Sequence, residues 1–172
     1  MDIKEKTVTK NYVYRGRIIK VRNDEALLPN GKPCLREVIE HNGGASVLAI
    51  DKDNHCYLVR QFRYPFNEET LEIPAGKLEV NEDPKLCALR ELTEETGLLA
   101  PDVDFLCKVY PTPGYSTEII YIYLAKEFIQ TQANPDEDEF LNVVKLPLSE
   151  AKAMAKNGEI KDAKTVVALL FV

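Results

Sequence analysis

The segment 83–96 constrains the fold most, because it predicts an amphipathic helix whose two faces differ in chemistry. Asp83-Pro84 is a typical helix start, an N-cap residue followed by proline at the first helical position, and Gly97 is a typical stop. At about 100° per residue, the bulky residues share a sector of about 120°, and the carboxylates centre on nearly the opposite side. The first sector holds Leu86, Leu89, Leu92 and Thr96, and the second holds Glu91, Glu94 and Glu95. We expect the first face to pack and the second to gather three carboxylates.

This clustering of glutamates would destabilise an isolated helix. Like charges three or four residues apart cost roughly a few tenths of a kcal/mol per pair, and negative charge near a helix C-terminus opposes the helix dipole. Arg90 offsets part of this cost through an i,i+4 pair with Glu94. Two interpretations are open at this point. The glutamates form a solvated surface, or they form a site for a hard cation such as Mg²⁺ or Mn²⁺, which prefers carboxylate oxygens.

Most of the remaining chain predicts strands. Runs rich in β-branched and aromatic residues lie between turn signals such as Asn30-Gly31 and the polar stretch 51–54. These strand candidates are residues 12–14, 17–22, 34–40, 47–50, 56–59, 71–76, 103–110, 118–125 and 140–146. Further helices are predicted over 149–156, ended by Asn157-Gly158, and over 163–170. Many strands with a few inserted helices indicate an α+β fold.

Composition excludes several classes of protein. A chain of 172 residues with 45% hydrophobic residues is long enough for one domain with a sizeable core. A formal net charge of -6 argues against a nucleic-acid groove, but not against a small anionic substrate, because a metal ion can reverse the local charge. No apolar run reaches the roughly 18 residues of a membrane span, and the N-terminus lacks the apolar stretch of a signal peptide. With four isolated cysteines, we expect a cytoplasmic protein without nucleic-acid or membrane partners.

The residues around the predicted helix match a known pattern. From Gly76 to Leu98 the sequence fits G-x5-E-x7-R-E-U-x-E-E-x-G-U at every fixed position, where U is a bulky aliphatic residue. The fixed positions are Gly76, Glu82, Arg90, Glu91, Leu92, Glu94, Glu95, Gly97 and Leu98. This is the Nudix box, so the chain resembles the Nudix hydrolases. Chance agreement at so many positions is negligible, which favours the cation site over the solvated surface.

The resemblance implies the Nudix fold, a mixed β-sheet sandwiched between helices in α/β/α layers. In this interpretation residues 1–44 form an N-terminal region of antiparallel strands for dimerisation and substrate contact, and residues 45–172 form the Nudix hydrolase domain. The family's members hydrolyse a nucleoside diphosphate linked to another group, with Mg²⁺, Mn²⁺ or another divalent ion as cofactor. Such ions neutralise the charge of a pyrophosphate and acidify water, which hydrolysis near neutral pH requires.

Box position implies a role for each residue of the site. Glu91, Glu94 and Glu95 become metal ligands, and the backbone carbonyl of Ala75 is a further ligand. Glu94, Arg90 and Glu82 are assigned to catalysis, with Glu82 supporting the site through Arg90. Gly76 and Gly97 are expected to allow sharp backbone turns at the two ends of the element.

The resemblance extends over nearly the whole chain to the ADP-ribose pyrophosphatase branch. The matching stretches are 14–18, 36–41, 59–65, 71–76, 113–118 and 136–140, and Pro113 lies 15 residues after Leu98, the usual marker of the branch. The resemblance implies six substrate-binding residues. These are Arg17 and Ile18 toward the adenine, Glu37 near its amino group, Glu79 near the ribose, Arg63 at the diphosphate or terminal ribose, and Gly114. A guanidinium fork suits phosphate oxygens, although the alternative is that Arg63 is a surface arginine paired with some glutamate.

The acidic run 136–139 ends at Glu139, which aligns with a glutamate of the branch that activates or positions water. Glu139 is therefore the candidate general base, and a metal-bridging water without a protein base is the rival mechanism. The expected reaction is metal-dependent hydrolysis of ADP-ribose to AMP and ribose 5-phosphate by a homodimer. Two alternatives stay open. One is another nucleoside diphosphate substrate, such as a nucleotide sugar, a dinucleotide or a flavin nucleotide, and the other is a non-catalytic ADP-ribose sensor.

Overall fold

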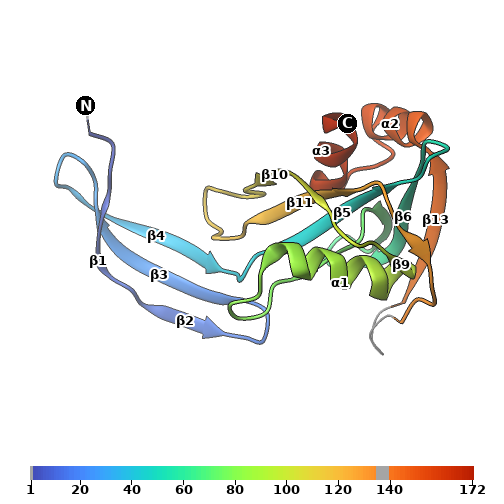
Figure 1. Cartoon of the computed structure of the whole chain (residues 1–172). Helices are drawn as coiled ribbons and strands as arrows, with labels where there is room; N and C mark the ends of the chain where they lie inside the picture. The colour runs from blue at the N-terminus through green and yellow to red at the C-terminus, as the bar shows by residue number, and fades with distance from the viewer. Residues whose placement is uncertain (1, 135–139) are drawn as a thin grey trace. The chain divides into compact units, whose positions relative to one another are not determined.

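The computed structural model describes residues 2–134 and 140–172. The chain divides into two compact units (Figure 1). Unit 1 comprises Met1–Gly43 and Tyr110–Ile119, and unit 2 comprises Gly44–Val109 and Ile120–Val172. The segment 110–119 thus joins the N-terminal strands, an association across the sequence that the division into residues 1–44 and 45–172 does not contain.

Unit 1 is built around an antiparallel sheet of four strands. Its central strand β3 (Lys20–Leu27) pairs with β1 (Lys6–Thr9), β2 (Tyr12–Arg15) and β4 (Pro33–Glu40). The tight turn between β3 and β4 falls at Asn30-Gly31 as predicted, and the Gly31 N–H donates to the Leu28 carbonyl at 2.8 Å. The sequence did not predict β1, whose four residues are all exposed, and it placed the start of β3 three residues too early.

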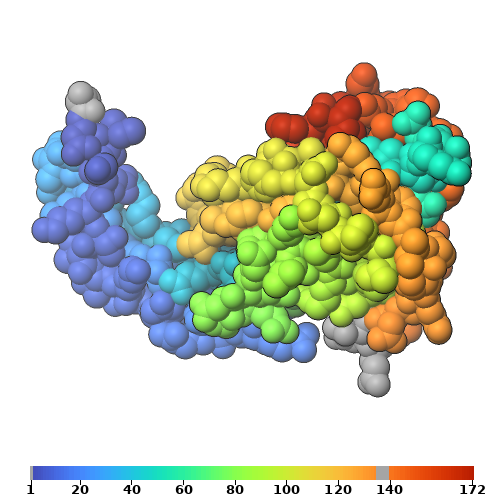
Figure 2. Space-filling view, in the orientation of Figure 1, coloured from blue at the N-terminus to red at the C-terminus, as the bar shows by residue number. Residues whose placement is uncertain are grey.

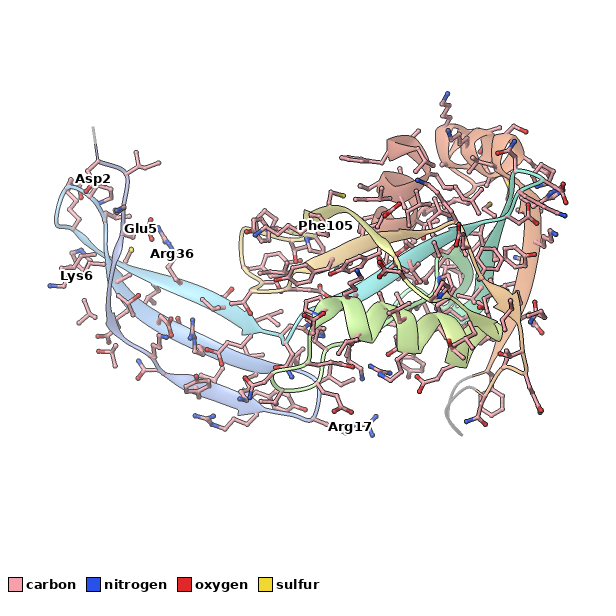
Figure 3. All side chains as sticks on the ribbon, viewed as in Figure 1. Asp2, Glu5, Lys6, Arg17, Arg36 and Phe105 are labelled. Atoms are coloured by element: carbon pink, nitrogen blue, oxygen red, sulfur yellow. The ribbon has the colours of Figure 1, made fainter. Side chains whose placement is uncertain are left out.

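The interior of unit 1 contains charge. On β3, alternate residues Arg22, Asp24 and Ala26 are buried, and Arg22 pairs with Asp24 at 3.1 Å and with Glu40. β1 and β2 are exposed along their whole length. Arg36 and Glu5 form an exposed ion pair at 2.6 Å between β4 and the residues before β1 (Figure 3). Unit 1 therefore gains less from apolar burial than a domain with a full core would.

Unit 2 contains a mixed sheet of seven strands. Its main path runs β10-β11-β5-β6-β13, with β7 paired to β6 and β8 paired to β5. β11 and β5 pair in parallel, and the other pairs described for this sheet are antiparallel. Its strands are β5 (Gly44–Ile50), β6 (His55–Arg63), β7 (Glu68–Glu72), β8 (Ala75–Lys77), β10 (Asp104–Val109), β11 (Ile120–Ala125) and β13 (Leu141–Pro147). Two short strands that the sequence did not predict, β9 (Leu98–Leu99) and β12 (Ile129–Gln130), pair with each other.

Strand β5 shows how unit 2 is layered, because its residues alternate between two apolar cores. Val47 and Ala49 belong to the core beneath α1 (Pro84–Thr96). Leu48 belongs to the opposite core, which includes residues of α2 (Leu148–Asn157) and α3 (Ala163–Phe171). The α+β class and the sandwich of a mixed sheet between helices are therefore confirmed (Figure 1).

Helix α1 begins and ends where predicted. The Asp83 carboxylate accepts hydrogen bonds from the backbone N–H groups of Lys85 and Leu86. At the other end Gly97 has φ 71°, the left-handed conformation that glycine adopts without strain, and donates its N–H to the Thr93 carbonyl. The expected turn at Gly97 is thus present. Helices α2 and α3 also lie within one residue of their predicted bounds.

The buried face of α1 differs from the prediction. Leu92 and Thr96 are buried and Leu89 packs against the same core, as expected, but Leu86 is 63% exposed. Glu91 and Glu95 were expected on nearly the opposite side, yet they are only 7% and 3% exposed. The buried residues are Cys87, Ala88, Glu91, Leu92, Glu95 and Thr96. Periodicity arguments weight large apolar side chains and overlook small ones such as Ala88, which let a helix approach a sheet closely. The other side of α1 forms part of the visible surface of unit 2 (Figure 2).

Among the residues that the structure describes, no helix is long and apolar enough to cross a membrane.

Candidate active site

The site forms where α1 lies against β8. Gly76 is inside β8, opposite Ala45 of β5, and a Cβ added to Gly76 would overlap the carboxylate of Glu91. The role of Gly76 is therefore to let Glu91 approach the strand, and the sharp turn expected at this residue is not there. A glycine at this position and a glutamate 15 residues later thus form one structural unit.

Glu95 is tied to the same strand. The Ala75 N–H donates to Glu95 Oε2 at 3.2 Å, so the backbone of Ala75 and the carboxylate of Glu95 are adjacent. Glu91 and Glu95 each lose solvent when α1 packs, and a buried carboxylate is costly unless it is paired with donors or a cation. The fold has therefore placed acidic groups where their charge must be satisfied.

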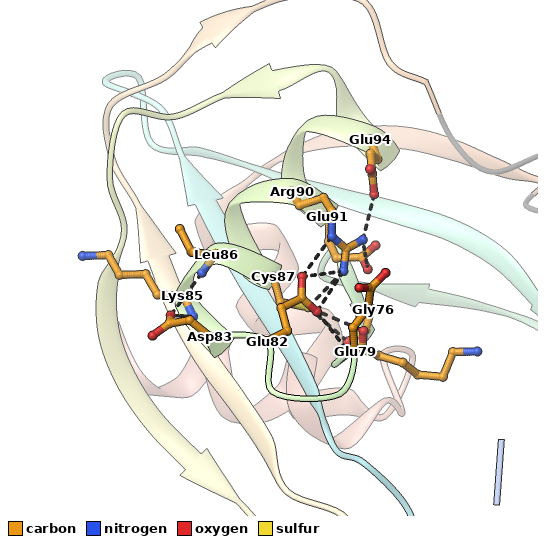
Figure 4. Close-up of polar contacts among 11 residues, drawn as sticks. Gly76, Glu79, Glu82, Asp83, Lys85, Leu86, Cys87, Arg90, Glu91 and Glu94 are labelled. Atoms are coloured by element: carbon orange, nitrogen blue, oxygen red, sulfur yellow. Dashed lines mark hydrogen bonds and ion pairs between the residues drawn. The ribbon is translucent and has the colours of Figure 1, made fainter.

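Arg90 satisfies part of this charge. Its guanidinium donates from Nε to Glu82 Oε1 at 3.1 Å, and from Nη1 to Glu91 Oε1 at 2.7 Å and Glu94 Oε2 at 3.0 Å (Figure 4). We call Glu82, Arg90, Glu91 and Glu94 the Arg90 cluster. It has one positive and three negative charges, and Glu95 lies beside it on the same helix. The pairing of Glu82 with Arg90 is the contact that the box position implied.

Electrostatics follow from these contacts. Burial works to lower the pKa of Arg90, but hydrogen bonds and charges of the surrounding glutamates outweigh it and raise the pKa. Partial burial works to raise the pKa of Glu82, but the Glu79 N–H at 2.9 Å and Arg90 outweigh it and lower the pKa. Burial, followed by the charge of Glu82, raises the pKa of the Cys87 thiol to about 12. The arginine and Glu82 therefore stay charged, and Cys87 stays a neutral thiol beside them.

The residues present fit a divalent cation in their chemistry. The donors are carboxylate oxygens in excess over the arginine that binds them, which is the environment that Mg²⁺ and Mn²⁺ prefer. Within residues 2–134 and 140–172, however, no three His, Cys, Asp or Glu side chains converge closely enough to hold an ion. Arg90 and the Ala75 N–H hold the carboxylates apart from one another in this arrangement. Side-chain rotation, chiefly of the partly exposed Glu94, would be needed to bring them together.

A second charged group includes the last residue of β6, Arg63, and the last residue of β7, Glu72. Arg63 donates from Nε to Glu72 Oε1 at 2.7 Å and from Nη2 to Glu72 Oε2 at 2.6 Å. Lys164 of α3 also donates to Glu72 Oε2 and lies 3.0 Å from Asp162. We call Arg63, Glu72, Asp162 and Lys164 the Arg63 cluster. The glutamate pairing considered for Arg63 is thus present: the arginine is partly exposed, and its partner Glu72 is buried.

The Arg63 cluster interacts electrostatically with helix α1, which we call the acidic helix because it carries Glu91, Glu94 and Glu95. Hydrogen bonds to Glu72 are the main cause that raises the pKa of Arg63, and the charge of Glu95 contributes in the same direction. Sequence reasoning missed Glu72 and Lys164. A signal was available, because Glu72 stands between the apolar residues Leu71 and Ile73, and a charged residue that is buried with them requires a partner.

The other substrate-binding candidates are Glu79 of unit 2 and four residues of unit 1. Glu79 is an exposed residue of the loop before α1 and contacts Glu82 through its backbone. Arg17 is exposed in the turn between β2 and β3 (Figure 3). Ile18 in the same turn and Gly114 in the segment 110–119 are also exposed. Glu37 on β4 lines a cavity of about 360 Å³ within unit 1, together with Arg22, Asn23, Tyr115 and the apolar residues Val13, Val21, Val38 and Ile39. Their contacts with substrate remain predictions.

Glu139, the candidate general base, lies outside the described residues.

Family models match both parts of the chain. The model described as NUDIX domain matches residues 40–169. The model described as Nucleoside diphosphate sugar hydrolase N-terminal domain matches residues 5–39. Together they cover the N-terminal strands and the sheet that carries the box.

Relatives and a solved structure match along almost the whole chain. The methanol dehydrogenase activator of Bacillus methanolicus is 41% identical over 98% of this chain and 92% of its own. The ADP-ribose pyrophosphatase of Bacillus subtilis (strain 168) is 38% identical over 99% of this chain and 93% of its own. A crystal structure of an ADP compounds hydrolase has a TM-score of 0.84 at 25% identity and covers 98% of this chain and 91% of its own. With the box residues gathered where α1 meets β8, these matches show that the chain belongs to the NUDIX family.

Proposed function

We propose that this Nudix hydrolase cleaves the pyrophosphate of ADP-ribose to AMP and ribose 5-phosphate, with Mg²⁺ or another divalent ion as cofactor. The observation that carries the proposal is the pair of buried glutamates, Glu91 and Glu95, packed against Gly76 and Ala75. The two relatives named ADP-ribose pyrophosphatase, from Bacillus subtilis and Mycobacterium tuberculosis, support the substrate at 38% and 32% identity. Each aligns with nearly the whole of this chain.

Glu91, Glu94, Glu95 and the Ala75 carbonyl are the groups that would hold the cation. A bound divalent ion neutralises the diphosphate and acidifies water. Arg90 offsets charge among the carboxylates and holds Glu82 in place, which limits their mutual repulsion.

Arg63 is proposed to donate to the diphosphate or terminal ribose, and Glu139 to accept the proton of the attacking water. Binding of the adenosine and ribose is assigned to Arg17, Ile18, Glu37, Glu79 and Gly114. We also propose that the chain acts as a homodimer in the cytoplasm.

A nucleotide sugar is the second candidate substrate. The GDP-mannose pyrophosphatase of Citrobacter koseri is 35% identical over 99% of this chain and 93% of its own. GDP-mannose and ADP-ribose share a nucleoside diphosphate joined to a sugar, so the same acidic helix would serve both. The base and the terminal sugar distinguish them.

A substrate panel tests this assignment. ADP-ribose, GDP-mannose, NAD and FAD are incubated with the wild-type chain and Mg²⁺, Mn²⁺ or excess EDTA, and nucleoside monophosphate is measured. We expect ADP-ribose to give the highest kcat/KM, and EDTA to abolish turnover. A higher kcat/KM for GDP-mannose would reassign the substrate. If the chain binds ADP-ribose but releases no AMP with any of the metal ions, it is a non-catalytic sensor of ADP-ribose instead of an enzyme.

Glu139→Gln tests the general base. Loss of a general base typically lowers kcat by about 10² to 10⁴. The glutamine keeps the size of the side chain but cannot take up the proton of water, so kcat should fall with KM little changed. An unchanged pH–rate profile and kcat would favour a mechanism without a protein base.

A further inference from the structure

Glu72 is a charged residue in the interior of unit 2. It is 1% exposed, and each of its two carboxylate oxygens accepts two hydrogen bonds. Oε1 accepts from Arg63 Nε at 2.7 Å and from Thr70 Oγ1 at 2.6 Å. Oε2 accepts from Arg63 Nη2 at 2.6 Å and from Lys164 Nζ. A carboxylate with four donors is fixed in orientation, and it fixes the groups that donate to it.

The fork between Glu72 and Arg63 leaves part of the arginine outside it. Glu72 engages Nε and Nη2, and Nη1 takes no part in these two bonds. The Arg63 side chain is 41% exposed, although its partner is buried. The arginine is therefore held from the interior side while part of its side chain faces solvent, and a guanidinium there can donate to an anion.

Lys164 stabilises the buried charge of Glu72. Its side chain is 7% exposed, and its charge offsets that of Glu72. Burial works to raise the pKa of Glu72, but Arg63 and Lys164 outweigh it and lower the pKa to about 2, so the carboxylate stays charged. A second hydrogen bond joins the end of β7 to α3: the Ile73 N–H donates to Thr165 Oγ1 at 2.8 Å.

The held arginine is close along the chain to the acidic site. Glu72 lies three residues before Ala75, whose N–H binds Glu95. β7 and β8 are thus joined by two residues, Ile73 and Pro74, and the Pro74 carbonyl accepts from Val47 N of β5 at 3.0 Å. Because this bond fixes the short connection to β5, we expect a change at Glu72 to act directly on Arg63 and only weakly on helix α1.

We propose that Glu72, with its charge offset by Lys164, is a positioning residue that holds the Arg63 guanidinium for contact with the diphosphate of the substrate. This inference rests on the proposed function. A purely structural ion pair would affect only the stability of the fold. The pair of Glu72 and Arg63 should also affect the affinity for substrate.

Steady-state kinetics of Glu72→Gln with ADP-ribose and Mg²⁺ test the inference. Glutamine keeps the shape, but its amide NH2 cannot accept a hydrogen bond, so one of the two bonds from Arg63 is lost and the other no longer ends on a charged oxygen. KM should therefore rise roughly tenfold or more, the effect of losing one charge-assisted hydrogen bond. kcat should change by less than about threefold, since Arg63 would act in binding. Glu68→Gln is the matched control, because Glu68 is on the same strand and pairs with Lys161 at 2.9 Å near the solvent. Its KM should stay within twofold of the wild type.

A double-mutant cycle separates positioning from structure. In the Arg63→Ala background, Glu72→Gln should change KM by less than about twofold, because its effect passes through the missing arginine. An equal KM increase in both backgrounds would overturn the inference, as would an unchanged KM in Glu72→Gln alone. If Glu72→Gln fails to fold, the double variant Glu72→Gln/Lys164→Met removes both buried charges together and should show the same KM increase.

The ¹⁵N resonance of the Arg63 Nε–H gives a readout independent of turnover. It is assigned by its loss in Arg63→Ala. In the wild type this proton should exchange slowly with water at neutral pH, and in Glu72→Gln rapidly. Rapid exchange in the wild type would overturn the inference. An inactive wild type with a slowly exchanging Nε–H would overturn the proposed function while leaving the holding of Arg63 by Glu72 in place.

Discussion

Two arginines in unit 2 are each held by glutamates, but the two groups differ in charge balance. The Arg90 cluster sets one guanidinium against three carboxylates, with Glu95 beside them. The Arg63 cluster sets two cations, Arg63 and Lys164, against two carboxylates, Glu72 and Asp162. The first group has an excess of negative charge, and the second is formally neutral.

This difference indicates what each group can bind. An excess of buried carboxylate oxygens stabilises a divalent cation that arrives from solvent, because the cation replaces charge that the chain itself does not supply. The neutral group needs no added cation to balance its charge, but its half-exposed arginine presents a fixed hydrogen-bond donor to an anion. Metal-dependent hydrolysis of a diphosphate uses a centre for the cation, and a donor to the anion helps to bind and orient the substrate.

The largest expected effect comes from removing one carboxylate of the acidic helix. Glu95→Gln keeps the shape but removes a proposed cation ligand, and we expect kcat with Mg²⁺ to fall on the order of 10³-fold. The measurement is AMP release from ADP-ribose, with the unfolding midpoint in urea as a control for folding. Glu127→Gln, at an exposed position of the same unit, is the matched control and should keep wild-type activity. Activity of Glu95→Gln within tenfold of the wild type would contradict the ligand assignment.

For the neutral Arg63 cluster, we expect the effect in how the free energy of unfolding changes at acid pH. The pKa of Glu72 is lowered from 4.5 to about 2, so its contribution is fully present above pH 4.5 and is lost as pH falls toward 2. A shift of this size corresponds to on the order of 3 kcal/mol of unfolding free energy. Urea denaturation at pH 7, 4.5, 3 and 2 should show wild type and Glu72→Gln far apart at pH 7 and converging by pH 2. A difference independent of pH would contradict the charged, paired state of Glu72.

Sequence reasoning predicted the acidic cluster better than the neutral one, for a physical reason. Glu82, Arg90, Glu91 and Glu94 lie within 13 residues along the chain, so helical spacing and the box pattern bring them together before any tertiary contact is known. The Arg63 cluster joins β6, β7 and α3, and Lys164 lies 92 residues from Glu72. No local pattern contains that pairing.

The fold shows the same limit. Helices α1, α2 and α3 were predicted within a residue or so, because caps and turn residues such as Asp83, Gly97 and Gly158 mark their ends. The face that α1 buries was predicted only in part, because Leu92 and Thr96 are buried as expected but Glu91 and Glu95 are buried too. Their burial depends on how closely the helix approaches β5 and β8. The short strands β9 and β12 also depend on pairing between distant segments. Local chemistry determines where elements end, and tertiary contact determines which side they bury.

Gly76→Ala is a smaller perturbation of the acidic site than loss of a ligand. The added Cβ meets the far end of the flexible Glu91 side chain, so the fold should survive while the carboxylate is displaced. A displacement near 1 Å can cost about 100-fold in rate, and we expect a loss of kcat of that order. Shortening the glutamate in Gly76→Ala/Glu91→Asp should restore part of the activity by making room. Full activity of Gly76→Ala would show that Glu91 does not act from its position against β8.

The smallest effect is expected for the exposed ion pair of Glu68 and Lys161, which joins β7 to the residues just before α3, as Glu72 joins β7 to α3. Both partners are more than one third exposed, so water screens their attraction and competes for their hydrogen bonds. Glu68→Gln should therefore lower the unfolding free energy by less than about 0.5 kcal/mol. Urea denaturation at low and high salt measures this directly. A loss as large as that of Glu72→Gln would mean that the connection between β7 and α3, rather than the burial of Glu72, sets the stability of the neutral cluster.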